Sequence, residues 1–201
     1  MNAGIVLCGG KSTRMGTSKA LLPFGNETML QRVLRVLGSV VSPIAAVAAP
    51  DQVLTDLPQA VILTRDEREG RGPLEGLRAG LKALPRSVDL AYVTSCDVPL
   101  LVPAFVTRML DLAEGFDIAV MEIDGFAHPL SAVYRRAVLP HVESLLAEDR
   151  LRPAFLFERV RTRRVRPEEV ADVDPELQTL RNLNTREDYE AALRGGPALD
   201  I

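Results

Sequence analysis

The first half of the chain alternates short apolar runs with longer segments in which apolar residues recur every three or four positions. The short runs end at glycine, proline or polar residues, as buried strands do. The longer segments place their apolar residues on one helical face. The pattern predicts strands at 3–7, 44–49, 60–64 and 90–95 and helices at 27–37, 73–84 and 103–113. This alternation predicts a mostly parallel sheet with helices on both faces.

The second half of the chain follows a less regular pattern. It predicts strands at 117–123, 130–134 and 160–165 and helices at 137–147 and 185–193. The last helix begins at Thr185, and Asp188 follows three residues later, which predicts a capping box with aspartate in place of glutamate. The strand at 160–165 is rich in arginine and is expected at an edge of the sheet, where charge discourages association.

Composition places the protein in an ordinary class. Apolar residues make up 47% and charged residues 25% of the chain, as in soluble globular proteins. No apolar run reaches about 18 residues and no secretion signal is evident, so we expect no membrane contact and a cytoplasmic location. The two cysteines, Cys8 and Cys96, are too few for a disulfide framework or a zinc site. A net charge of −3 gives no support for binding nucleic acid.

The distribution of charge is more informative than its sum. The first 26 residues contain Lys11, Arg14 and Lys19 but no acidic residue before Glu27. A positive segment on an acidic protein suits a polyanionic small ligand. Chance fluctuation over a short window is the alternative at this point.

The letters G-K-S at 10–12 suggest a P-loop, but the spacing is wrong. A P-loop needs G-x-x-x-x-G-K-[ST] after a strand. Gly4 and Gly9 have the required interval, yet Lys11 arrives one place late and the interval is the predicted strand itself. The dinucleotide spacing G-x-G-x-x-G is absent as well. Both interpretations are therefore disfavoured.

What remains is a long loop with paired glycines and three cations. Gly9 and Gly10 allow the backbone to approach a ligand closely, because they lack Cβ. Arg14 suits bidentate contact with phosphate oxygens and Lys19 supplies a compact charge. The loop and Asp97 both follow predicted strands, and parallel sheets bind ligands at that edge. Asp97 is thus a candidate Mg²⁺ ligand, although aspartate also ends strands for structural reasons.

At this point the motifs carry a resemblance. The stretch "LCGGKSTRMGTSK" (7–19) resembles the L-x-G-G-x-x-x-R-M-G-x-x-K signature of nucleotidyltransferases that transfer NMP from an NTP to a phosphate. Within that superfamily the chain most resembles the molybdenum cofactor guanylyltransferases, over roughly residues 3 to 193. The other matching motifs are "GPLEGL" (72–77), "CDVP" (96–99), "HPLSAVYRRAVLP" (128–140) and "NLNTREDYEAA" (182–192).

The resemblance implies a fold and a division of the chain. The fold would be a three-layer α/β/α, Rossmann-like domain with a mostly parallel sheet, similar to nucleotide-diphospho-sugar transferases. One domain would cover 1–195, with a nucleotide-binding half at about 1–115 and an acceptor-binding half at about 116–195. The tail at 196–201 is expected to be frayed.

The resemblance also implies roles for residues of the first half. Leu7, Cys8 and Gly9 would line the guanine and ribose, and Gly10 would also belong to the nucleotide-binding residues. Arg14, Lys19 and Asp97 would be the catalytic residues: the two cations would hold phosphates and Asp97 would bind Mg²⁺. Further nucleotide contacts would come from Asp66, Gly72 and Gly76. Glycine at 72 and 76 could equally serve a turn and helix packing.

Two asparagines match the family's acceptor-binding positions. Asn182 and Asn184 would contact molybdopterin, and because Thr185 supplies the helix cap, both amides are left for that task. The arginines of 159–166 are a weaker candidate for contact with the anionic pterin. One departure stands out: residues 46–50 read "AVAAP", where the family often has an asparagine, so a base or ribose contact there is in doubt.

The implied reaction is Mg²⁺-dependent transfer of GMP from GTP to the terminal phosphate of molybdopterin, with release of pyrophosphate. The implied partners are GTP and molybdopterin, with transient contacts to cofactor-synthesis or acceptor proteins. Alternatives remain open: a related transferase that uses CTP or a sugar-phosphate acceptor, a nucleotide-binding module without catalysis, and a P-loop kinase.

Overall fold

The computed structural model describes residues 1–9 and 18–195. The expectations for Gly10, Lys11, Arg14 and the tail at 196–201 therefore lie outside the described residues. Strands are labelled β, helices α and 3₁₀ turns η. In chain order the elements are β1 (Asn2–Leu7), η2 (Lys19–Leu21), β2 (Pro23–Phe24), β3 (Glu27–Thr28), α1 (Met29–Gly38), β4 (Ile44–Ala48), β5 (Val61–Arg65), α2 (Pro73–Ala83), β6 (Leu90–Ser95), α3 (Pro103–Leu112), β7 (Ile118–Ile123), β8 (Phe126–Arg135), η3 (Arg136–Val138), α4 (Leu139–Ala147), α5 (Ala154–Phe157), β9 (Thr162–Val165), η4 (Pro167–Glu169), η5 (Gln178–Leu180) and α6 (Arg186–Gly195).

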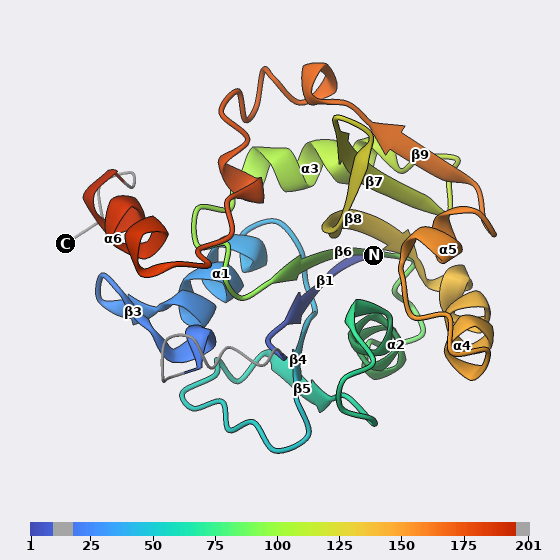
Figure 1. The fold of residues 1–201 in the computed structure, drawn as a ribbon, viewed down its shortest axis with the longest axis horizontal. Coiled ribbons are helices and arrows are strands. Elements are labelled where there is room, and N and C mark those ends of the chain that lie inside the picture. Colours follow the sequence, from blue (N-terminus) through green and yellow to red (C-terminus); the bar gives the residue numbers. More distant parts are fainter. Residues whose placement is uncertain (10–17, 196–201) are drawn as a thin grey trace.

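A central sheet organises the molecule (Figure 1). Its strands follow the order β5-β4-β1-β6-β8-β7-β9. The pairs of β1 with β4 and β6, of β4 with β5 and of β7 with β9 are parallel, whereas β8 runs antiparallel to both of its neighbours. The predicted mostly parallel sheet is confirmed. Because β1, β4, β5 and β6 are parallel, their carboxyl ends meet along one edge.

Helices cover both faces of the sheet, with α1 and α3 on one side and α2 and α4 on the other (Figure 1). Strand β1 contacts the helices on both faces, because successive side chains of a strand point to opposite faces of the sheet. Val6 packs in the cluster with α1 and α3, while Ile5 and Leu7 pack in the cluster with α2 and α4. The central strand is buried on both faces, as parallel strands generally are.

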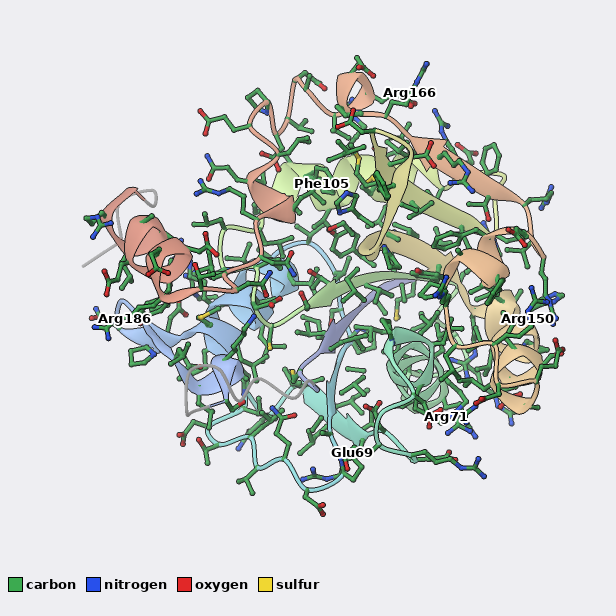
Figure 2. All side chains as sticks on the ribbon, in the orientation of Figure 1. Glu69, Arg71, Phe105, Arg150, Arg166 and Arg186 are labelled. Carbon is green, nitrogen blue, oxygen red and sulfur yellow. The ribbon has the colours of Figure 1, made fainter. Side chains whose placement is uncertain are left out.

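Side chains divide clearly between the interior and the rim (Figure 2). Phe105 of α3 is completely buried and lies inside the molecule, where it packs in the same cluster as Val6. Arg150, Arg166 and Arg186 lie at the periphery. Among the helices formed by residues 1–9 and 18–195, none has the length and apolar character needed to cross a membrane.

Every element that the hydrophobic pattern predicts is present, although β8 begins at Phe126 rather than at 130, and the start of α1 is also shifted. Its predicted first residues, Glu27 and Thr28, form β3 and pair with β2 around Gly25, which has φ +67°. Thr28 then caps α1: its side chain accepts a hydrogen bond from the Gln31 amide, and the Gln31 side chain accepts from the Thr28 amide. Strands of two residues are too short for a periodicity to show.

The C-terminal helix α6 returns to the N-terminal hairpin, and Figure 1 shows it beside β3. Leu183 and Ala192 are buried in one cluster with Phe24 of β2, and the Tyr189 hydroxyl donates a hydrogen bond to the Pro23 carbonyl. The predicted capping box is confirmed, since the Thr185 amide donates to the Asp188 carboxylate and the Asp188 amide donates to the Thr185 hydroxyl. Segments that are about 165 positions apart in the sequence are thereby brought together.

The arginine-rich strand β9 lies at the edge of the sheet, as predicted. Two of its arginines form ion pairs with carboxylates of the same chain. Arg163 pairs with Glu169 at 2.9 Å, and Arg164 pairs with Glu122 of β7. These arginines are already engaged with carboxylates, which favours a structural role over one in binding the anionic pterin.

Candidate active site

A cavity of about 620 Å³ opens at the carboxyl ends of the parallel strands. Residues directly after β1, β4, β5 and β6 contribute to its lining. The described part of the chain contains ten of the residues predicted for the site, and all of them line this cavity. They are Leu7, Cys8, Gly9, Lys19, Asp66, Gly72, Gly76, Asp97, Asn182 and Asn184. Their chemical roles stay predictions.

An ion pair lies at the centre of the site. The Lys19 Nζ atom lies 3.0 Å from Asp97 Oδ2, and each of the two side chains is only 14% exposed. Asp97 follows β6, where the Ser95 hydroxyl donates to its Oδ1 at 2.6 Å. Lys19 begins η2 on the other side of the undescribed segment 10–17. The fold thus joins two predicted catalytic residues that are 78 positions apart.

The two asparagines meet this ion pair directly. Asn184 Oδ1 accepts a hydrogen bond from Lys19 Nζ at 2.6 Å, and Asn182 Nδ2 donates to Asp97 Oδ1 at 3.3 Å. The intervening Leu183 amide donates to the Asp97 carbonyl oxygen at 2.9 Å. Three hydrogen bonds therefore attach the segment before α6 to the ends of the ion pair. The expectation that both amides are left free by the helix cap is incomplete, because each already has a partner within the chain.

Asp66 directly follows β5, and its surroundings disfavour the ionised form of its carboxyl. Its Oδ1 atom is buried and has no hydrogen-bond partner among the described residues. Burial, and next the negative charge of Glu75, raise the pKa of Asp66 to about 6, although Arg78 acts in the opposite direction. A Cβ on Gly9 would lie 3.3 Å from Asp66 Oδ2, so glycine lets this carboxyl approach the end of β1. Asp66 as a residue lines the cavity.

The two glycines of "GPLEGL" serve the backbone in different ways. Gly72 precedes α2 with φ +71°, a left-handed conformation that favours glycine. Gly76 lies inside α2 where the helix approaches β1: a Cβ there would lie 2.9 Å from the Leu7 side chain. Helix packing is therefore one reason for glycine at 76, and Leu7 reaches the cavity beside it.

The two cysteines lie side by side after β1 and β6. The hydrogen bond with the Cys96 thiol, and next burial, raise the pKa of the Cys8 thiol well above its ordinary value. A thiol kept protonated is a poor nucleophile. Both cysteines are buried and line the cavity, and Cys8 is therefore better suited to a structural role than to nucleophilic attack.

Sequence reasoning missed several polar residues near the cavity, among them Ser18, Ser95 and Gln52. Ser95 lies two residues before Asp97, and the alternation of a strand, which places such residues on one side, could have indicated it. Gln52 was not singled out, although its Nε2 atom donates to the Cys8 carbonyl oxygen at 3.0 Å. Residues 46–50 carry no side-chain amide. Gln52 is therefore the first residue with a side-chain amide after β4.

Oxygen donors at the end of β6 suit a hard cation. Asp97 offers a carboxylate, and phosphate oxygens of a bound nucleotide could complete a coordination shell of the kind that Mg²⁺ prefers. Among the described residues, no group of three or more histidine, cysteine, aspartate or glutamate side chains could hold a metal ion.

Known proteins resemble this chain over nearly its whole length. A protein of Carboxydothermus hydrogenoformans, named probable molybdenum cofactor guanylyltransferase, is 32% identical over 191 residues, which cover 94% of this chain and 93% of that protein. A protein of Methanosarcina acetivorans with the same name is 35% identical over 205 residues and covers 95% of this chain, with 89% of its own length matched.

Solved structures share the fold. Molybdopterin-guanine dinucleotide biosynthesis protein A from Archaeoglobus fulgidus superposes with a TM-score of 0.77 at 20% identity, over 96% of this chain and 97% of that one. The 2-C-methyl-D-erythritol 4-phosphate cytidylyltransferase from Thermus thermophilus gives 0.69 at 16% identity, over 96% and 98%. The predicted fold class is confirmed. Residues 4–163 match the MobA-like NTP transferase domain, and the chain belongs to that family.

Proposed function

We propose that this protein transfers GMP from GTP to the terminal phosphate of molybdopterin, which bears molybdenum, and so forms the guanine dinucleotide form of the cofactor. The meeting of Lys19, Asp97, Asn182 and Asn184 at one cavity carries the proposal. In this arrangement an ammonium group, a carboxylate and two amides belong to one hydrogen-bonded group. The names of the relatives support guanine as the base and molybdopterin as the acceptor.

The reaction exchanges one P–O bond for another. A terminal phosphate oxygen of molybdopterin attacks the α-phosphorus of GTP, and a new P–O–P linkage forms. The bond between the α-phosphorus and the oxygen that bridges to the β-phosphorus breaks, and pyrophosphate leaves with the electron pair. Because the attacking phosphate is already anionic, the step needs no strong general base, and its rate depends on positioning and charge neutralisation.

Lys19 and Asp97 would serve these two needs. Lys19 would exchange its contact with Asp97 for phosphate oxygens, since its ammonium group lies at the cavity wall. Asn182 and Asn184 would hold the two charged side chains in register and contact the acceptor once it is bound. Arg14 is a further predicted phosphate ligand, and it lies outside the described residues.

We place the divalent metal at Asp97 and infer that it is Mg²⁺. The carboxylate lies at the cavity wall, and its oxygens are held by Ser95, Asn182 and Lys19. One carboxylate together with substrate phosphates is a common Mg²⁺ site. When bound, the cation would neutralise charge on the phosphates of the nucleotide and the leaving group. A cytoplasmic location and transient contacts with cofactor-synthesis or acceptor proteins complete the proposal.

The test is pyrophosphate release, measured with each of the four NTPs, with and without molybdopterin, and with Mg²⁺ or EDTA. We expect release only when GTP, molybdopterin and Mg²⁺ are all present. Release with CTP in place of GTP, or with a sugar phosphate in place of molybdopterin, would assign a related transferase instead. Nucleotide binding without release in any mixture would indicate a binding module, and transfer of the γ-phosphate would indicate a kinase.

A further inference from the structure

One side-chain amide outside the cavity lining joins three residues that line the cavity. Gln52 lies in the connection between β4 and β5 and is half-buried. Its Oε1 atom accepts a hydrogen bond from the Ala49 amide at 3.0 Å, while Nε2 donates to the Cys8 carbonyl at 3.0 Å and to the Ser18 hydroxyl at 3.1 Å. Ala49, Cys8 and Ser18 all belong to the cavity wall. A single group thus ties three parts of the wall together.

The chemistry of these contacts matches a carboxamide. The Ala49 amide needs an acceptor, and the Cys8 carbonyl and the Ser18 hydroxyl each need a donor. The planar carboxamide of glutamine provides one acceptor oxygen and a nitrogen with two hydrogens. A glutamate would keep the acceptor but place a carboxylate oxygen against the Cys8 carbonyl. A methionine of similar length would keep the volume and lose all three hydrogen bonds.

The backbone that carries Gln52 is itself held in place. A guanidinium nitrogen of Arg65, at the end of β5, lies 2.9 Å from the Ala49 carbonyl, 3.0 Å from the Pro50 carbonyl and 2.7 Å from the Gln52 carbonyl. Hydrogen bonds from a charged donor are stronger than neutral ones. Arg65 therefore orders the connection before any ligand binds, and this lowers the entropy that a ligand must overcome.

We propose that Gln52, supported by Arg65, is a positioning residue for the nucleotide. Cys8 stands at the end of β1, and Ser18 directly precedes Lys19, so the Gln52 amide fixes the separation between the β1 end of the wall and the start of η2. This separation sets the affinity for nucleotide, while Gln52 itself does not touch the reacting atoms. The proposal rests on the proposed function and adds a residue to it.

The experiment compares Gln52→Met, Gln52→Glu and Arg65→Met with the unaltered protein. For Gln52→Met we expect the KM for GTP to rise about tenfold, since this fold-change corresponds to the strength of one or two ordinary hydrogen bonds and only part of the energy of the three lost bonds acts on nucleotide binding. The kcat should stay within about twofold, because the reacting groups are unchanged. Gln52→Glu should raise the KM for GTP by more than tenfold. Arg65→Met should raise it about threefold relative to the unaltered protein, because its effect on the Gln52 side chain is indirect. The Kd for a GTP analogue with a methylene between the α- and β-phosphorus, measured without acceptor, should follow the KM.

A second measurement does not depend on catalysis. Hydrogen exchange at the amides of Leu21 and Leu22, which are bonded to the Ser18 and Lys19 carbonyls, should become faster in Gln52→Met. The matched control is Gln59→Met in the same connection, where the side chain is exposed. It should leave KM, Kd and exchange unchanged.

Unchanged Kd and exchange in Gln52→Met would overturn the proposal. A fall in kcat with constant KM would also overturn it, since that would place Gln52 in the chemical step. An effect confined to Gln52→Glu would show added charge rather than lost positioning. If the unaltered protein released no pyrophosphate from any NTP, the proposed function would fail, and the exchange measurement would still decide the role of Gln52.

Discussion

At the scale of single residues, the ion pair of Lys19 and Asp97 is the chemical centre of the cavity. Each of its ends has further hydrogen bonds within the chain: Asn184 accepts from Lys19, and Ser95 donates to Asp97. A neutral substitution at either end therefore leaves the other end with a partner. Loss of charge at this site should affect the reaction much more than the fold.

Lys19→Ala or Asp97→Ala is expected to lower kcat/KM by at least about a hundredfold, since preorganised charge at a reacting phosphate contributes on that scale. The melting temperature should change by only a few degrees. The measurement is pyrophosphate release under saturating Mg²⁺, with circular dichroism to follow unfolding. Lys82→Ala is the control, because Lys82 forms exposed ion pairs on α2. Near-normal activity of either site variant would refute the assignment.

Asp66 supports a prediction about pH. Its pKa is raised to about 6 by burial and by Glu75, so the folded protein binds the proton more tightly than the unfolded chain does. The protonated carboxyl therefore contributes to the free energy of unfolding. This contribution is fully present below the unfolded pKa of about 3.8, and it is lost as the pH rises through about 6 and the carboxyl ionises. Asp66→Asn should therefore raise the free energy of unfolding by about 1 kcal/mol at pH 7.5, after allowance for solvent screening.

The measurement for Asp66→Asn is urea unfolding at pH 4.0, 5.5 and 7.5. The gain should shrink as the pH falls, because the carboxyl becomes protonated and resembles the amide. An equal effect at all three values would mean that Asp66 is not the titrating group. Asp149→Asn, at an exposed carboxylate paired with Arg71, provides the comparison.

At the scale of elements, the contact between α2 and β1 forms one wall of the site. Gly80 and Gly76 let the helix approach the strand, because a Cβ would lie 2.6 Å from Ile5 at Gly80 and 2.9 Å from Leu7 at Gly76. The two strand residues differ in their freedom to move. Ile5 is β-branched and fully buried, whereas the Leu7 side chain ends at the cavity.

Gly80→Ala should lower the free energy of unfolding by about 1–2 kcal/mol, because overpacking against Ile5 outweighs the gain in helix propensity. Gly38→Ala is the matched control, since a Cβ there would lie 3.6 Å from Ile44, an ordinary contact. Chemical denaturation of the three proteins measures the difference. A Gly80→Ala protein as stable as Gly38→Ala would contradict the packing argument.

Gly76→Ala should instead act on the cavity. The added methyl group would push the flexible Leu7 side chain toward the nucleotide, so the KM for GTP should rise several-fold while stability changes little. Steady-state kinetics together with denaturation separates the two effects. If Gly76→Ala lost stability as Gly80→Ala does and kept its KM, the displacement of Leu7 would be ruled out.

At the scale of the whole molecule, the site depends on the contact between the segment 182–192 and the N-terminal β2–β3 hairpin. The segment that carries Asn182 and Asn184 is anchored by Leu183, which is buried with Phe24 and Ala192. This small cluster is separate from the two that fill the sheet faces. The acceptor side of the site can therefore loosen while the sheet stays folded.

Leu183→Ala is expected to raise hydrogen exchange across 182–194 and in the β2–β3 hairpin, with β1 and β6 still protected. Transfer should fall about tenfold, because a displacement of about 1 Å in positioning groups costs rate on that scale or more. Leu193→Ala, at an exposed leucine of α6, should change neither quantity. Exchange that rises equally in β1 and β6 would show that the cluster stabilises the whole fold instead.

The sequence by itself determined the order and type of the main elements. Apolar periodicity located the sheet strands and the major helices, because an element that is buried on one or both faces needs apolar residues at regular positions. Because Gly9 and Asp97 both follow predicted strands, the sequence also indicated the edge of the sheet at which the site lies. Patterns shorter than a few residues, such as the β2–β3 hairpin, left no periodicity and were missed.

Only the tertiary structure decided how the site residues are paired. Asn184 and Lys19 are 165 positions apart in sequence, and their hydrogen bond exists because α6 packs on the N-terminal hairpin. Gln52 belongs to no motif, and its proposed role follows from three partners that lie after β1, after β4 and before η2. Local sequence encodes local periodicity, whereas contacts between distant segments depend on how the helices and the sheet pack together. The sequence thus determined the elements and the kind of site, and packing decided which polar groups touch.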